Sequence, residues 1–310
     1  MQTTLIGYTG FVGSNLYNKH KFDNIYNSKN ITEAFDKTHD LVIYSGIRAE
    51  KYLANTNPEA DKQVILNAIE NIKKLNPKKL VLISTVDVYK TPDNVDENTI
   101  IDTENLHPYG YNRYLLEQWV QENINDYLII RLPGLYGMGI KKNFLYDMFT
   151  IIPFMLTHEK YSALNSQNSI IEKNYEILND KFYKLADIPL QQKDELKEFF
   201  INNDFNALSF TDSRSSFQFY NLGNLWNDIN TALNNNIKLL NLNSQSVTAG
   251  DIYKYINNKN FNNITANSPV YYDIKTIHSN VFNGTNGYIK TKDEILKDIA
   301  LHIKTEFKNV

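Results

Sequence analysis

The chain has 310 residues, of which 42% are hydrophobic and 22% charged, and its formal net charge is −3. This ordinary globular composition argues against disorder, and the lack of excess basic charge argues against nucleic acid as a partner. The absence of cysteine excludes disulfides, thiolate zinc sites and cysteine nucleophiles, and it favours a reducing, cytoplasmic location.

Strands and helices are predicted to alternate over the first 140 residues. Mixed apolar and polar positions at helical spacing predict helices, and short apolar runs predict strands. The expected helices are 11–19, 31–37, 60–75 and 111–120, and the expected strands are 3–7, 22–27, 41–44, 79–83 and 127–132. Near-continuous apolar strands separated by helices indicate an α/β fold with a doubly wound, Rossmann-type parallel sheet.

The pattern changes after residue 140. Residues 141–212 are polar, rich in Asn and Lys, and helical in pattern, for example at 191–200. Strand and helix patterns return at 217–220, 225–233, 239–242 and 251–256. We predict a dinucleotide-binding domain at 1–140, completed by about 213–250, and a smaller substrate-binding or lid region formed by a helical insertion at 141–212 and by 251–310.

A glycine-rich turn follows the first predicted strand. Gly7, Gly10 and Gly13 lie in GYTGFVG at the start of the first helix, which is the context of a dinucleotide-binding fingerprint. Glycines let the backbone approach a pyrophosphate, while free amides at the helix start, here those of Phe11 and Val12, bind its charge. An ordinary turn could contain the same triplet, so the later motifs decide between the two.

Three further motifs follow in order. LVLISTVDVY at 80–89 contains Thr85 at a strand end, HPYGYNR at 107–113 places Tyr109 four residues before Arg113, and RLPGLYG covers 131–137. With GYTGFVG, this order resembles the extended short-chain dehydrogenase/reductases, which include nucleotide-sugar epimerases, dehydratases and reductases. Weaker similarity continues at 217–229 and 239–256.

The resemblance implies catalytic roles. Thr85 would hold a substrate oxygen and Tyr109 would exchange its proton, helped by a cation that stabilises a phenolate of ordinary pKa ~10. Most of the family has lysine at that position, whereas this chain has Arg113, whose larger planar head keeps its proton. Arg113 is therefore a working substitute that binds the nicotinamide ribose, part of a site with altered chemistry, or a relic in a protein without turnover.

The resemblance also implies a cofactor site. Besides the glycine-rich turn, Tyr109 and Arg113, this site would include Thr9, Tyr44, Ser45, Gly46 and Pro133. An acid at the end of the second strand would bind a ribose 2′-hydroxyl and select NAD(H). Asn27, Ser28 and Lys29 stand there instead, which favours NADP(H) over NAD(H).

Three residues are candidates for contacting the substrate. Asp87 stands where related dehydratases carry an acid, and Asn143 and Arg214 are placed to meet a diphosphate, for which an arginine fork is suited. The alternative for Asp87 is a solvated loop carboxylate, and the alternative for Arg214 is an exposed structural arginine. By resemblance the substrate is a small molecule of the nucleotide-sugar class, and a homodimer is expected by analogy alone.

No metal site or membrane segment is expected. The 6 histidines are scattered and lie apart from paired carboxylates. No leader opens the chain, and the longest apolar run, 148–156, is far shorter than the ~20 residues of a membrane helix.

Two functions remain open. The first is an NAD(P)-dependent oxidoreductase or epimerase/dehydratase that transfers hydride to or from a carbonyl or hydroxyl group. The second is a catalytically silent NAD(P)-binding or redox-sensing protein, for which Arg113 is the best support. Partner contacts through the insertion at 147–212 are a further, weaker hypothesis.

Overall fold

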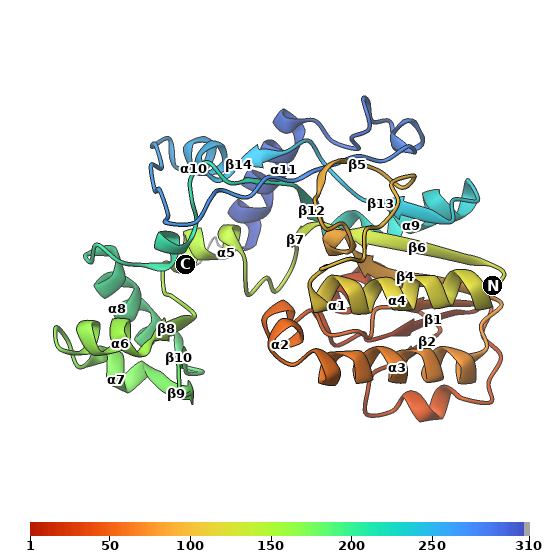
Figure 1. Ribbon diagram of the computed structural model, residues 1–310, viewed down its shortest axis with the longest axis horizontal. Coiled ribbons are helices and arrows are strands. Elements are labelled where there is room, and N and C mark those ends of the chain that lie inside the picture. Colours follow the sequence, from red (N-terminus) through yellow and green to blue (C-terminus); the bar gives the residue numbers. More distant parts are fainter. Residues whose placement is uncertain (307–310) are drawn as a thin grey trace. The chain divides into compact units, whose positions relative to one another are not determined.

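The computed structural model describes residues 1–306 and divides into two compact units (Figure 1). The first unit comprises residues 1–140, 216–247 and 270–306. The second comprises residues 141–215 and 248–269. The chain therefore leaves the first unit twice and returns to it twice.

A six-stranded parallel sheet, in the order β13-β6-β4-β3-β1-β2, forms the centre of the first unit. Its strands are β1 (Thr3–Ile6), β2 (Asn24–Tyr26), β3 (Leu41–Tyr44), β4 (Lys79–Thr85), β6 (Tyr127–Leu132) and β13 (Leu239–Asn241). The chain builds outward from β1 to β2 on one side and to β3 on the other, so the strand order reverses at β1. Sheets of this kind bind ligands at the carboxyl ends of the strands beside such a reversal.

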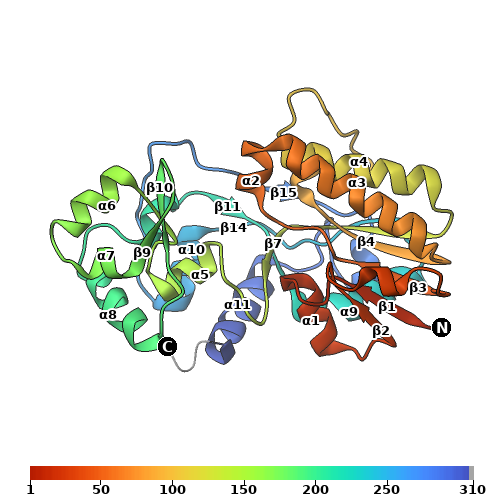
Figure 2. The same ribbon diagram turned by 90° about the horizontal axis from the view of Figure 1, so that it is seen from below.

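Helices cover both faces of this sheet (Figure 2). On one face, α1 (Phe11–Lys19) and α9 (Leu225–Asn234) pack on the strands, and on the other α3 (Pro58–Leu75) and α4 (Pro108–Asn123) do so. In α3, Ile65, Ala68, Ile72 and Leu75 recur at helical spacing and are buried, which explains why this helix lies flat on the sheet. The predicted doubly wound α/β fold is confirmed.

The C-terminal region differs from its expected grouping, because residues 270–306 belong to the first unit. The Gln218 side chain hydrogen-bonds both backbone groups of Ile274, each at 2.8 Å.

The other elements of the first unit are η1 (Ile31–Ala34), α2 (Lys51–Thr56), η2 (Val86–Val88), β5 (Asp93–Val95), β7 (Gly134–Tyr136), β11 (Ser216–Phe217), β12 (Phe219–Asn221), η4 (Leu222–Asn224), β15 (Asp273–Ile274), η5 (Ser279–Phe282) and α11 (Lys292–Glu306).

The sequence predicted a helical insertion, but the second unit also contains strands. It contains a three-stranded antiparallel sheet in the order β8-β10-β9. Its elements are α5 (Phe144–Thr150), β8 (Met155–Thr157), α6 (His158–Asn165), α7 (Ile170–Asn174), β9 (Tyr175–Asn179), β10 (Phe182–Leu185), α8 (Leu190–Ile201), η3 (Ala207–Phe210) and α10 (Ala249–Asn257), and β14 (Val247–Thr248) precedes the last helix. These strands were missed because β9 buries only Tyr175 and shows no alternation of apolar residues.

A buried ion pair joins α4 to the sheet. Glu117 is fully buried and Arg131 of β6 is 2% exposed, with 2.6 Å between Nη2 of Arg131 and Oε2 of Glu117. The Ser84 hydroxyl of β4 donates to Glu117 at 2.5 Å, and Arg131 donates to the Tyr89 hydroxyl at 2.8 Å. A buried pair is tolerated when its remaining polar atoms have partners, as they do here.

Replacing Glu117 with Gln removes the counter-charge of a buried guanidinium. We expect the free energy of unfolding of Glu117→Gln to fall by about 3–5 kcal/mol. Urea denaturation followed by circular dichroism measures this change. Glu70→Gln, which removes the exposed partner of Lys73, is the control and should have a much smaller effect. Equal losses in the two variants would show that the buried pair does not anchor α4.

Candidate functional site

Two of the three glycines in the turn after β1 are required by the protein's own packing. Gly7 has φ +89°, and a Cβ there would lie 2.7 Å from the backbone of Ser45 after β3. A Cβ on Gly13 would lie 2.1 Å from the Gly7 carbonyl oxygen. These glycines let the ends of β1 and β3 and the start of α1 approach one another closely.

Gly10 is different, because packing does not require it. A Cβ at this position would have one neighbour within 4 Å, the Gly7 oxygen at 3.4 Å. Gly10 is also the N-cap of α1, which has neither a side-chain cap nor an acid in its first turn. The amides of Phe11 and Val12 thus begin a helix without a side-chain acceptor, beside open space, and this arrangement fits a pyrophosphate.

The segment after β2 carries no acid close to this turn. Asn27 accepts a hydrogen bond from the Lys29 amide at 2.9 Å and so closes a local turn, while Ser28 and Lys29 are exposed. Around the same carboxyl edge, Tyr44 is buried, Thr9 and Gly46 are exposed, and the Ser45 hydroxyl donates to the Ile6 carbonyl at 2.7 Å. The structure therefore gathers these predicted residues at the ends of β1, β2 and β3.

Thr85 and Tyr109 lie on neighbouring elements. Thr85 ends β4, Tyr109 lies in the first turn of α4, and the Thr85 hydroxyl is among the groups that influence the pKa of the Tyr109 phenol. Gly110 allows α4 to approach the segment after β4, because a Cβ there would lie 2.1 Å from the Asp87 carbonyl oxygen. Pro133 directly follows β6, whose Leu132 pairs with Thr85 in the sheet.

Arg113 lies against the ring of Tyr109. Its Cζ atom is 3.9 Å from the ring centroid. Nη1 donates to Asp61 at 2.5 Å and to the Tyr109 carbonyl at 3.3 Å, and Nη2 donates to the Arg48 carbonyl at 2.7 Å. The guanidinium is therefore fixed between α3, α4 and the segment after β3.

Asp87 forms an ion pair that the sequence had not indicated. The Lys51 ammonium of α2 lies 2.6 Å from the Asp87 carboxylate. Lys51 and Asp61 were both missed, because an exposed lysine and an acid in the first turn of a helix are typical surface features. Only the three-dimensional contacts reveal that both belong to the surroundings of Tyr109.

The environment of Tyr109 favours its protonated form. Burial raises the pKa of the phenol above its ordinary value, the charge of Arg113 lowers it, and Asp87 and Asp61 raise it further. The Thr85 hydroxyl lowers the pKa slightly. Tyr109 can therefore donate a proton to a neighbouring oxygen at neutral pH, and it is a poor base there.

The two predicted diphosphate ligands lie in the second unit and have structural partners. Asn143 is the N-cap of α5 and accepts from the amides of Leu145 and Tyr146. Arg214 is half exposed and donates from Nε and Nη2 to the two carboxylate oxygens of Asp212, at 2.9 and 2.8 Å. Their role toward a substrate stays a prediction.

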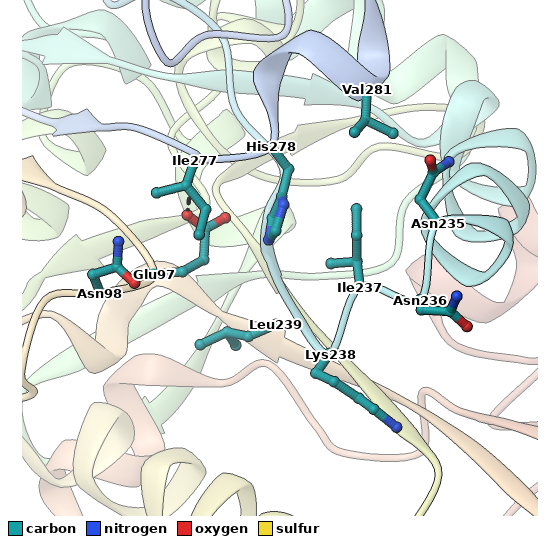
Figure 3. Close-up of a pocket in the computed structure, with 10 residues that line it drawn as sticks. All are labelled: Glu97, Asn98, Asn235, Asn236, Ile237, Lys238, Leu239, Ile277, His278 and Val281. Carbon is teal, nitrogen blue, oxygen red and sulfur yellow. Dashed lines mark hydrogen bonds between the residues drawn. The ribbon is translucent and has the colours of Figure 1, made fainter.

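A surface pocket of about 380 Å³ lies beside the edge strand β13 and contains none of the predicted site residues (Figure 3). Its polar wall includes Glu97, Lys238 and His278. Glu97 already accepts hydrogen bonds from the amides of Asn241 and Ile277, at 2.7 and 2.9 Å. The Glu97 carboxylate thus serves to hold the edge of the sheet.

The described residues contain neither a metal-binding cluster nor a membrane-spanning helix. Between Met1 and Glu306, no group of three or more His, Cys, Asp or Glu side chains is arranged to hold a metal ion. None of the helices in this range combines the length and the apolar character of a membrane span.

The chain matches one protein-family model and resembles several solved structures. The family model of the RmlD substrate binding domain matches residues 1–160. The dTDP-4-dehydrorhamnose reductase of Yersinia enterocolitica has a TM-score of 0.63 at 14% identity, covering 99% of this chain and 100% of that one. The Bacillus anthracis dTDP-4-dehydrorhamnose reductase in complex with NADP has a TM-score of 0.62 at 16% identity, covering 98% and 99%.

A UDP-galactose 4-epimerase is also similar, with a TM-score of 0.61 at 13% identity and 99% of both chains covered. At these identities the likeness to solved structures establishes a shared fold. No curated protein sequence matches the chain.

Alanine substitutions separate the two kinds of glycine in the turn. We expect Gly13→Ala to lower the free energy of unfolding by about 1–3 kcal/mol, because its Cβ overlaps the Gly7 oxygen. Gly10→Ala should change it by no more than about 1 kcal/mol, the difference between glycine and alanine as an N-cap. Urea denaturation of both variants checks this, and a larger loss in Gly10→Ala would contradict it.

Proposed function

Because the chain belongs to the family of the RmlD substrate binding domain, within the extended short-chain dehydrogenase/reductases, we propose that it is an NAD(P)-dependent oxidoreductase. Its proposed substrate is a carbonyl or hydroxyl group of a nucleotide sugar. The observation that carries the proposal is the placement of Thr85 at the end of β4 and of Tyr109 in the first turn of α4, in the same unit as the glycine turn. The named relatives, a reductase and an epimerase of nucleotide sugars, support the substrate class.

Each residue of the pair has a defined task in this proposal. A bound nicotinamide dinucleotide supplies or accepts the hydride. The Thr85 hydroxyl hydrogen-bonds the reacting oxygen and sets its position. The Tyr109 phenol transfers the proton to that oxygen, and the Gly7–Gly13 turn binds the pyrophosphate through the backbone.

For the cofactor we propose NADP(H) over NAD(H). The segment of Asn27, Ser28 and Lys29 offers an exposed ammonium and no carboxylate, so a 2′-phosphate meets no repulsion. The reductase from Bacillus anthracis that shares this fold is described as an NADP complex, which agrees with this preference.

For the substrate we propose contacts from Asp87, Asn143 and Arg214. The Asp212 carboxylate fixes Nε and Nη2 of Arg214 and so sets the direction of a half-exposed guanidinium, an arrangement suited to a phosphate group. Asp87 is 21% exposed and reaches the surface beside Lys51.

A silent NAD(P)-binding protein is the second candidate. The observation that favours it is the engagement of Arg113, whose guanidinium donates to Asp61 and two carbonyl oxygens and does not act as a free cation near the phenol oxygen. Such a protein would bind the dinucleotide as tightly as the enzyme but would not oxidise it.

Tyr109→Phe tests the proposed reaction. We expect turnover of NADPH with a nucleotide-linked keto sugar to fall by about 10²–10⁴-fold, because the proton donor is lost, while NADPH binding is kept. The decay of NADPH absorbance and calorimetric titration measure the two quantities. Tyr111→Phe, an exposed position on the same helix, is the control and should retain activity. Binding without turnover in the unmodified protein would favour the silent alternative, and no binding would overturn both.

Lys29→Asp tests the cofactor preference. We expect the ratio of NADH to NADPH affinity to rise by about tenfold or more, because the new carboxylate repels the 2′-phosphate and can bind a 2′-hydroxyl. Parallel calorimetric titrations with the two cofactors measure the ratio. Lys21→Asp makes the same charge change just before β2 and should leave the ratio unchanged. If both variants changed the ratio equally, the cofactor preference would come from the overall surface charge and not from Lys29.

A further inference from the structure

Arg113 occupies the position of the family's lysine but is held in a different way. Its Cζ atom lies over the face of the Tyr109 ring, 3.9 Å from the centroid. Three hydrogen bonds, to Asp61 and to the carbonyls of Tyr109 and Arg48, fix this pose. The side chain is only 4% exposed, so water does not compete for these donors.

Asp61 supplies a full counter-charge to this guanidinium. Its carboxylate is 11% exposed and 2.5 Å from Nη1 of Arg113. The same oxygen accepts a hydrogen bond from the Asn112 side chain at 2.8 Å, so the carboxylate is fixed as well. A positive and a negative charge thus lie side by side next to Tyr109, and the carboxylate offsets part of the effect of the guanidinium on the phenol.

The other groups that face Tyr109 add no free positive charge. Asp87, in the segment after β4, is paired with Lys51 of α2 at 2.6 Å. The ring of His107 stacks 6.4 Å from that of Tyr109, and burial lowers the pKa of His107, so that it is neutral at neutral pH. Thr85 contributes a neutral hydroxyl. Lys51 and Arg113, the two cations named here, are therefore each paired with a carboxylate.

We infer that Asp61 is a positioning residue, which holds Arg113 on the ring of Tyr109 and offsets part of its charge, so that Arg113 orients the phenol without making it a stronger acid. The inference rests on the proposed function for its chemical meaning. In reduction, the carbonyl carbon gains a hydride from the reduced dinucleotide, the C=O π bond breaks, and the oxygen takes the proton of Tyr109. Water then returns a proton to the phenolate.

This arrangement separates reduction from epimerisation. An epimerase first removes a hydroxyl proton and therefore needs a phenolate at the start of its cycle. A phenol beside two compensated ion pairs is the wrong protonation state for that step and the right one for a reductase. A resting phenol therefore favours the reductase among the two classes of relatives.

The test measures the phenol itself, in the full-length protein without cofactor or substrate. Tyrosine is replaced throughout by 3-fluorotyrosine, whose more acidic phenol titrates in a milder pH range, and the fluorine resonance of Tyr109 is identified by its absence in Tyr109→Phe. For Asp61→Asn we expect the titration midpoint to fall by about one pH unit, because the charge of Arg113 is no longer offset. Glu59→Gln, which removes a neighbouring exposed carboxylate of α3, is the matched control and should leave the midpoint in place.

Arg113→Met gives the opposite sign and a second route to a result if Asp61→Asn does not fold. Here the carboxylate of Asp61 is uncompensated, so the midpoint of Tyr109 should rise. An unchanged midpoint in either folded variant, or a shift equal to that of Glu59→Gln, would overturn the inference. A protein that shows the expected shifts but binds no NADPH would uphold the role of Asp61 and overturn the proposed function.

Discussion

The ion pair between Glu117 and Arg131 is the contact on which the geometry of the site depends. Residues four apart lie on the same face of a helix, so Tyr109, Arg113 and Glu117 form one stripe of α4. Glu117 fastens the inner end of this stripe to β4 and β6 through Ser84 and Arg131. Because a helix is rigid over two turns, the position of Tyr109 beside Thr85 follows from an anchor two turns away.

The glycines permit close contacts between backbone segments at the carboxyl edge of the sheet. Gly7 and Gly13 are required because chain segments from β1, α1 and β3 meet there, and Gly110 is required where α4 meets the segment after β4. Gly10 is free of this demand and faces open space at the start of α1. The turn therefore combines a packing constraint with an exposed, uncapped helix N-terminus, and the second feature is the one suited to an anion.

The sequence predicted what depends on local order and missed what depends on distant contacts. The parallel sheet followed from apolar runs and is confirmed, whereas the pairing of Thr85 with Tyr109 was implied by the resemblance to the dehydrogenase/reductase family. The antiparallel strands β8–β10 were missed because they are short and largely exposed. The partner of Arg113 was missed because Asp61 precedes it by 52 residues, and nothing in a helix start distinguishes this acid from any other.

The exchange of lysine for arginine can be understood from the shapes of the two cations. An ammonium is a compact charge on a flexible stem, suited to reaching an oxygen, whereas a guanidinium is a plane that stacks on a ring and donates in several directions at once. Here the plane covers Tyr109, and its edges donate to Asp61 and to the carbonyl of Arg48. The arginine therefore gives up part of its electrostatic effect on the phenol oxygen. In return, the guanidinium is fixed by α3 and the segment after β3, and it holds the ring of Tyr109 in one orientation, as a proton donor requires.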